Sequence, residues 1–116
     1  MHEMSIAAGL IDQVLAAAAE HGLARVERVE VQAGQMRQVV PEALAMAWEA
    51  VSAGTVADGA ELALTEVPAE LRCRGCGREF RRRRDEFLCP ECGRADVEVV
   101  AGDEILLTSI SAEIQE

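Results

Sequence analysis

The sequence predicts an α+β fold in which two helices lie on a small mixed β-sheet and a four-cysteine, zinc-ribbon-like module is inserted into the chain. Three observations predict it. Apolar residues recur at helical spacing in two segments, other segments alternate between apolar and polar residues, and all four cysteines lie in one Arg- and Gly-rich stretch. With 116 residues, half of them apolar, the chain is long enough for one ordinary core and a small appended module.

The first predicted helix runs from Ile6 to Ala19. Ser5 could cap its start with a side-chain oxygen, and Gly22 could supply the left-handed residue that ends it. The strand predicted next covers Val29–Ala33, where apolar and polar residues alternate, and Gly34 closes it. The helical face is defined by the apolar residues Ile6, Leu10, Ile11, Val14, Leu15 and Ala18.

The second predicted helix begins at Pro41, because the proline ring suits the first turn of a helix, and stops near Gly54. Residues 60–67 form the next predicted strand, which Pro68 ends. A last strand is predicted over residues 105–110 and is expected to return to the first sheet. The buried stripe of the second helix comprises Leu44, Ala47, Trp48 and Val51.

This order predicts two parts. Residues 1–68 plus 103–116 are expected to form the α+β domain, and residues 69–102 an inserted module. The composition changes sharply to Cys, Gly and Arg from Leu71 to about Asp96, which places the module there.

Charge and composition exclude several classes of protein. The formal net charge is −10 and there are three aromatic residues, so a general nucleic-acid-binding surface, which needs basic and stacking groups, is not expected. No apolar stretch approaches the roughly 20 residues of a membrane span. The start Met1-His2-Glu3 carries an acid where a secretory signal carries positive charge. We therefore expect a cytoplasmic protein, in which four cysteines favour metal binding over disulfides.

The cysteines form two matching motifs, Cys73-Arg-Gly-Cys76-Gly and Cys89-Pro-Glu-Cys92-Gly, with twelve residues between them. Two residues between cysteines let both sulfurs approach one ion from a tight turn. The glycine after each pair lets backbone N–H groups point at the thiolates. Two such turns supply four soft ligands in a tetrahedron, as in closed structural zinc sites. The prediction is one structural Zn²⁺ held by Cys73, Cys76, Cys89 and Cys92.

Other chemistries fit this spacing less well. A rubredoxin-like iron site has a longer separation and aromatic surroundings. A redox pair needs one Cys-x-x-Cys that opens a helix after a strand. A catalytic zinc needs an open position for water, which four thiolates do not leave. A folding role is favoured because the segment has almost no apolar core of its own.

Four consecutive arginines, Arg81–Arg84, lie between the two cysteine motifs. One interpretation is a contact for an acidic partner or a phosphate. The other, which we favour, is a solvated hairpin, because from Glu70 to Glu98 eight arginines are offset by seven acids.

The N-terminus has its own coordination chemistry. Methionine aminopeptidases act before small residues, so Met1 should remain before His2 with a free α-amine. That amine, the His2 backbone nitrogen and the His2 imidazole can close two fused chelate rings around one ion. Ni²⁺ and Cu²⁺ can deprotonate such an amide, and the tetragonal, nitrogen-rich geometry suits these metals. Glu3 adds a carboxylate or a second backbone nitrogen. The alternative is an ordinary exposed histidine at a frayed end.

Together these segments resemble the HypA/HybF family of nickel-insertion accessory proteins for [NiFe] hydrogenase. The resemblance rests on the Met1-His2-Glu3-Met4-Ser5 start, the helix after it, the Gly34 and Pro41–Leu44 region, and the paired cysteine motifs, in the same order over essentially the whole chain. Met4 stands where the family often has leucine.

The resemblance implies a nickel metallochaperone that is not an enzyme. It implies that His2 binds Ni²⁺ as transferred cargo with the Met1 amine and Glu3, that the four cysteines bind zinc, and that a HypB-type GTPase is the partner in loading the large-subunit precursor of [NiFe] hydrogenase. The sequence contains no phosphate-binding Gly-rich loop of its own and no free nucleophile–base pair. The rival prediction is a zinc-ribbon module that binds protein or nucleic acid through Arg81–Arg84.

Overall fold

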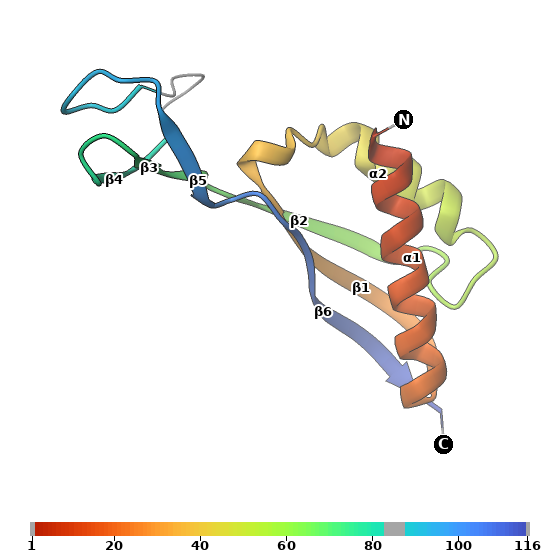
Figure 1. The fold of residues 1–116 in the computed structure, drawn as a ribbon. Helices are drawn as coiled ribbons and strands as arrows, with labels where there is room; N and C mark the ends of the chain where they lie inside the picture. Colours follow the sequence, from red (N-terminus) through yellow and green to blue (C-terminus); the bar gives the residue numbers. More distant parts are fainter. Residues whose placement is uncertain (1, 83–87, 116) are drawn as a thin grey trace. The chain divides into compact units, whose positions relative to one another are not determined.

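The computed structural model describes residues 2–82 and 88–115 and confirms the α+β prediction (Figure 1). By its internal contacts the chain divides into two compact units. The helical unit comprises Met1–Gln32, Val39–Thr65 and Leu106–Glu116, and the cysteine unit comprises Ala33–Gln38 and Glu66–Ile105. In chain order the elements are α1 (His2–His21), β1 (Leu23–Gly34), a 3-10 turn (Gln35–Arg37), α2 (Pro41–Ser52), β2 (Glu61–Val67), β3 (Glu70–Cys73), β4 (Glu79–Arg81), β5 (Val97–Ala101) and β6 (Ile105–Ile114).

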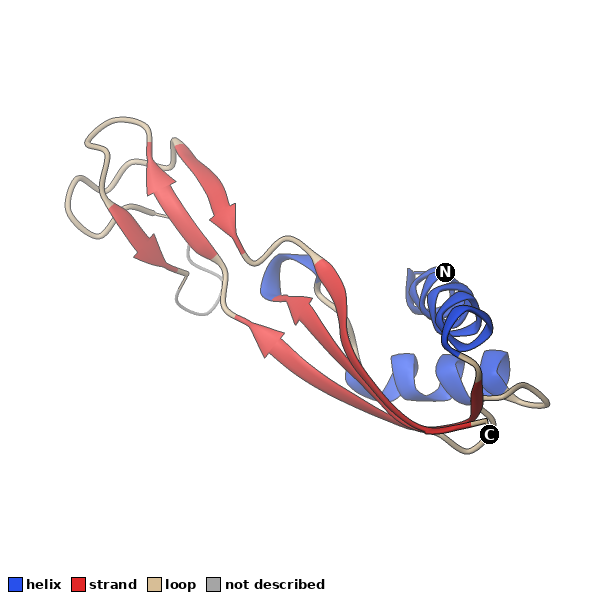
Figure 2. Ribbon diagram, turned by 90° about the horizontal axis from the view of Figure 1, so that it is seen from below, coloured by secondary structure: helices blue, strands red, loops and turns tan. Residues whose placement is uncertain are grey.

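The helical unit is a three-stranded sheet in the order β2-β1-β6 with α1 and α2 beside it. β1 and β2 run in the same direction and β6 runs in the opposite one, so the sheet is mixed, and the last strand returns to it as predicted (Figure 2). Two hydrogen bonds tie the end of the chain to β1. Thr108 Oγ1 in β6 donates to Glu30 O in β1, and Gln115 N, just after β6, donates to Gly22 O, just before β1. The described residues include no helix that is both long and apolar enough to cross a membrane.

Helix α1 begins four residues earlier than the sequence predicted, at His2 instead of Ile6. Ser5 therefore lies inside the helix and does not cap it, which corrects that expectation. The predicted end is confirmed, because Gly22 follows the helix with a φ of 62°, which favours glycine. The buried face comprises Ala7, Leu10, Ile11, Val14 and Ala18. Leu15, which the apolar spacing placed on this face, is 38% exposed.

Helix α2 has Pro41 in its first turn, as predicted, and ends at Ser52, two residues before Gly54. Leu44 and Ala47 form a core cluster with Ala7 of α1. Trp48 is 3% exposed, and its indole N–H donates to the carbonyl of Ala60 at 3.1 Å. The partly buried side chains around this cluster are Ile6, Val39, Val51, Leu62 and Leu64.

The cysteine unit contains a second sheet, in the order β4-β3-β5, which is antiparallel throughout and which the sequence did not predict. Leu71 in its central strand is fully buried and pairs with Phe80 of β4 and Val99 of β5. The three strands are only three to five residues long. This sheet carries the first cysteine, since β3 ends at Cys73.

Three chain segments lie against one another in the cysteine unit, around Gly34, Ala69 and Gly102. Gly34 N donates to Glu104 O at 2.7 Å, and Met36 N donates to Gly102 O at 3.0 Å. The side-chain oxygen of Gln35 accepts from Ala69 N at 2.9 Å. These bonds explain why the 3-10 turn belongs by contact to the cysteine unit.

We expect Gly34→Ala to destabilise the protein by about 1–3 kcal/mol, because an added methyl group would overlap the Gly102 carbonyl and lie 2.7 Å from Asp103 N. Its φ of −65° is open to alanine, so the cost is steric. Gly9→Ala is the matched control, since its methyl group meets nothing within 4 Å. In the middle of a helix it should stabilise by about 0.5–1 kcal/mol. Urea denaturation of both variants tests this, and equal stability would contradict the close packing around Gly34.

Candidate metal sites

The four cysteine side chains converge in the cysteine unit. Their sulfur atoms all lie within 4.8 Å of one another, with Cys73 and Cys92 3.4 Å apart and Cys76 and Cys89 3.6 Å apart. Among the described residues this is the one group of three or more His, Cys, Asp or Glu side chains placed to share an ion. The first cysteine of each motif is buried and the second is exposed.

Both motifs adopt the same backbone turn. Cys73 N donates to Arg78 O at 2.9 Å, and the N–H of the glycine after the first pair donates back to Cys73 O at 2.8 Å. The second motif repeats this pattern, with Cys89 N donating to Arg94 O at 3.0 Å and Gly93 N to Cys89 O at 2.9 Å. The glycines that close the turns, Gly77 and Gly93, have φ values of 78° and 69°. The turn geometry therefore explains the glycine after each pair.

Backbone N–H groups directed at the sulfurs ease loss of the thiol protons. The N–H of Cys76 lowers the pKa of Cys73, and the N–H of Cys92 lowers the pKa of Cys89 to about 7. At Cys76 the N–H of Arg78 acts in the same direction, but the hydrogen bond with Cys89 and desolvation outweigh it and raise the pKa to about 11. Cysteine binds a metal as the thiolate, so a bound cation would replace the thiol protons at these sulfurs.

The donor set fits zinc. Four sulfurs at the usual Zn–S distance of about 2.3 Å form a tetrahedron with edges of about 3.8 Å, close to the two sulfur–sulfur distances here. Such a closed shell holds a structural ion and leaves no position for a catalytic water.

Four arginines of the cysteine unit pair with acids along its strands and turns: Arg72, Arg74, Arg78 and Arg81. Arg72 contacts Glu79 at 3.5 Å and Glu98 at 3.3 Å, and Arg81 contacts Glu70 at 3.6 Å. These exposed pairs support the solvated-hairpin interpretation of the arginine run at Arg81. Arg83 and Arg84 lie outside the described residues.

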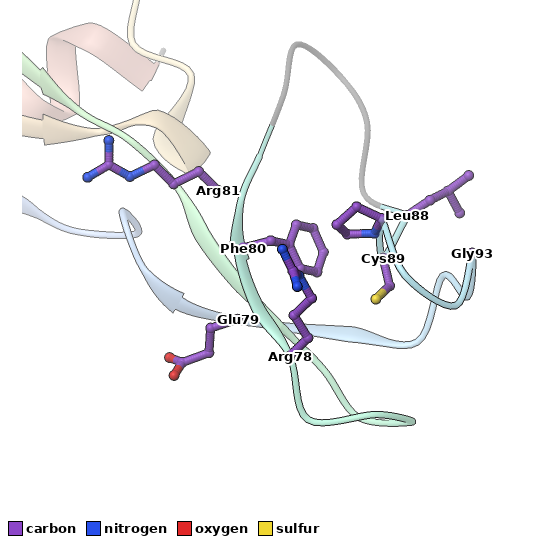
Figure 3. Close-up of a pocket in the computed structure, with 8 residues that line it drawn as sticks. Arg78, Glu79, Phe80, Arg81, Leu88, Cys89 and Gly93 are labelled. Carbon is purple, nitrogen blue, oxygen red and sulfur yellow. The ribbon is translucent and has the colours of Figure 1, made fainter.

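A hollow of about 480 Å³ lies beside the second cysteine motif (Figure 3). Arg78 and Phe80 point toward it, whereas Glu79 and Arg81 point away. Arg78 is engaged by Glu91 at 2.6 Å. Among the described residues that line the hollow, Cys89 is the one thiol, and it belongs to the four-cysteine cluster.

The N-terminal residues predicted to bind nickel lie at the start of α1. His2 is exposed and is the first residue of the helix, and Glu3 is half-buried. Met1 lies outside the described residues. The structure adds a contact that the sequence did not reveal, because Val40 N donates to Glu3 Oε2 at 3.3 Å. This N–H, followed by that of Glu3 itself, lowers the pKa of the Glu3 carboxyl.

The fold and the cysteine cluster together define a two-unit α+β protein with four cysteine sulfurs placed to share one metal ion. The sequence matches, over residues 1–112, the family described as "Hydrogenase/urease nickel incorporation, metallochaperone, hypA". The chain belongs to this family of nickel metallochaperones for hydrogenase maturation. They are accessory proteins of the maturation process.

Relatives and solved structures agree with this assignment. The chain is 43% identical over 115 residues to "Hydrogenase maturation factor HypA" of Streptomyces avermitilis, covering 97% of this chain and 88% of the relative. It is 38% identical over 113 residues to the Desulfitobacterium hafniense protein of that name, covering 97% and 99%. "Solution structure of the Ni metallochaperone HypA from Helicobacter pylori" matches in fold with a TM-score of 0.71, 24% identity and 99% and 100% coverage. "Solution structure of HypA protein" matches with a TM-score of 0.72, 26% identity and 99% and 98% coverage.

Proposed function

We propose that the chain binds one Ni²⁺ at its N-terminus and helps deliver it to the large-subunit precursor of [NiFe] hydrogenase, without catalysing a reaction itself. The proposed ligands are the Met1 amine, the backbone nitrogen and imidazole of His2, and a group from Glu3. Residues 1–68 plus 103–116 then form the nickel-binding domain, and residues 69–102 the zinc-binding module.

The observation that carries the proposal is the position of His2 at the first turn of α1. Backbone N–H groups in the first turn of a helix have no carbonyl partner four residues earlier. The nitrogens of His2 and Glu3 are therefore free of helical hydrogen bonds. A metal that deprotonates them breaks no helical bond, and Ni²⁺ is a metal that can do so.

An exposed site at a chain end also suits release. His2 is open to solvent, so a receiving site can displace its ligands one at a time. If nucleotide energy is needed, a partner must supply it, and we propose a HypB-type GTPase for that role. The four cysteines hold Zn²⁺ in a closed shell and serve folding rather than cargo transfer.

An N-terminal tag should abolish tight nickel binding, because it turns the chelating amine into an amide. We expect nickel affinity to fall at least about 30-fold in the N-terminally extended protein, a loss of about 2 kcal/mol. A tag of the same sequence at the C-terminus is the control and should be harmless. Isothermal titration with Ni²⁺ measures both. Equal affinity would remove the α-amine from the site and favour the rival zinc-ribbon binding module, which predicts no effect.

A further inference from the structure

The Glu3 carboxylate lies close to the starts of both helices of the helical unit. It is in the first turn of α1, and its Oε2 accepts from Val40 N, 37 residues away in sequence, at 3.3 Å. Val40 is the residue that precedes α2, and its apolar side chain makes no capping hydrogen bond. Glu3 therefore acts on α2 as the third-position glutamate of a capping box does on its own helix, by binding the N–H of the cap residue.

This contact favours both helices electrostatically. A negative side chain is stabilising near a helix N-terminus, where unpaired N–H groups concentrate positive partial charge. One carboxylate supplies that charge to α1 and α2 together. Val40 also accepts from Leu44 N at 3.0 Å, so the residue that Glu3 holds is itself fixed to the first turn of α2.

We propose that Glu3 is a positioning residue of the nickel site, whose carboxylate clasps the first turn of α1 to Val40 and so holds the nitrogens of His2 and Glu3 ready for the metal. The inference rests on the proposed nickel site and assigns the Glu3 side chain the role of a clasp instead of a ligand. Nickel can then take nitrogen atoms alone from the first residues, which suits its tetragonal preference. Without the clasp, the first turn frays and each binding event must order it again.

Glutamine and alanine at position 3 separate the two roles. Glutamine keeps an oxygen acceptor of the same length for the Val40 N–H, so a clasp survives Glu3→Gln. A carboxylate ligand would be lost equally in Glu3→Gln and Glu3→Ala. Glu42→Ala is the matched control, because it removes one negative charge from the first turn of α2 without removing the acceptor of the Val40 N–H.

Nickel titration of these variants, each with its native N-terminus, gives the first readout. We expect Glu3→Ala to weaken nickel affinity about 10-fold, equivalent to about 1.4 kcal/mol. We expect Glu3→Gln to stay within about twofold of the parent, because a neutral acceptor keeps most of such a bond. Glu42→Ala should match the parent. An equal large loss in Glu3→Gln and Glu3→Ala would show that the carboxylate binds the metal.

Hydrogen exchange at the Val40 amide gives a second readout that does not depend on nickel affinity. In the metal-free protein, exchange should be faster in Glu3→Ala than in the parent and Glu3→Gln. Adding Ni²⁺ to the parent should leave Val40 protected, whereas a carboxylate that moves to the metal would expose it and overturn the proposal. If the parent bound no nickel at its N-terminus, the proposed function would fail, while protection in the metal-free protein would still report the clasp.

Discussion

Replacing His2 with alanine should abolish stoichiometric nickel binding while the fold stays intact. The substitution removes the imidazole, which closes one of the two proposed chelate rings. We expect affinity for Ni²⁺ to fall about 100-fold or more, a loss of about 2.7 kcal/mol. His2 is exposed and begins α1, so the core of the helical unit does not depend on it. Isothermal titration and thermal denaturation measure the two effects separately.

The same variant should leave hydrogenase short of nickel in cells. His21 offers an internal control, because it is the other histidine and lies at the opposite end of α1. His21→Ala should bind nickel like the parent and support hydrogenase maturation. A His2→Ala protein with parental nickel affinity would contradict the site assignment.

Local sequence pattern accounts for most of the helical unit. The spacing of apolar residues predicts both helices and most of their buried faces, although Leu15 is exposed, and Gly22 and Pro41 mark boundaries through their own backbone preferences. The cysteine spacing predicts the sulfur cluster, because two short turns of fixed geometry leave few ways to arrange four thiols.

What the sequence missed depends on contacts between distant residues. Ser5 is a plausible cap, yet α1 begins at His2, where the Glu3 carboxylate reaches Val40 in another part of the chain. No local pattern contains that bond. The 3-10 turn between β1 and α2 also depends on a distant residue, because the Gln35 side-chain oxygen accepts a hydrogen bond from Ala69 N.

The sequence did not predict the strands of the cysteine unit because each is only three to five residues long and has at least one charged residue among its apolar ones. β3 carries Arg72 between Leu71 and Cys73, which is an alternation too brief to distinguish from a loop. In the folded sheet the opposite charges of Arg72, Glu79 and Glu98 face one another across the strands. These charges could have indicated the sheet only if the pairing register had been known, and the sequence alone does not give that register.

Replacing Cys92 with serine should unfold the cysteine unit and spare the helical unit. The serine hydroxyl stays protonated and leaves zinc with three good ligands. Structural zinc sites supply about 10–16 kcal/mol to the folding of small modules, more than the short strands β3, β4 and β5 can replace. Cys92 is exposed, so its removal leaves no cavity, and any loss of order follows from the metal. We expect zinc to fall well below one ion per chain.

The helical unit carries its own core around Leu44 and Ala47, and the nickel ligands proposed at His2 belong to that unit. The Cys92→Ser protein should therefore keep its nickel capacity, lose amide protection around Leu71, and keep it at Val14. Cys76 is the exposed cysteine of the first motif, and Cys76→Ser should have the same effects on zinc content, nickel capacity and amide protection. Metal analysis and hydrogen exchange test both variants. If zinc were retained and nickel lost, the cysteines would serve the cargo, and the proposed division between a structural zinc and a transferred nickel would be wrong.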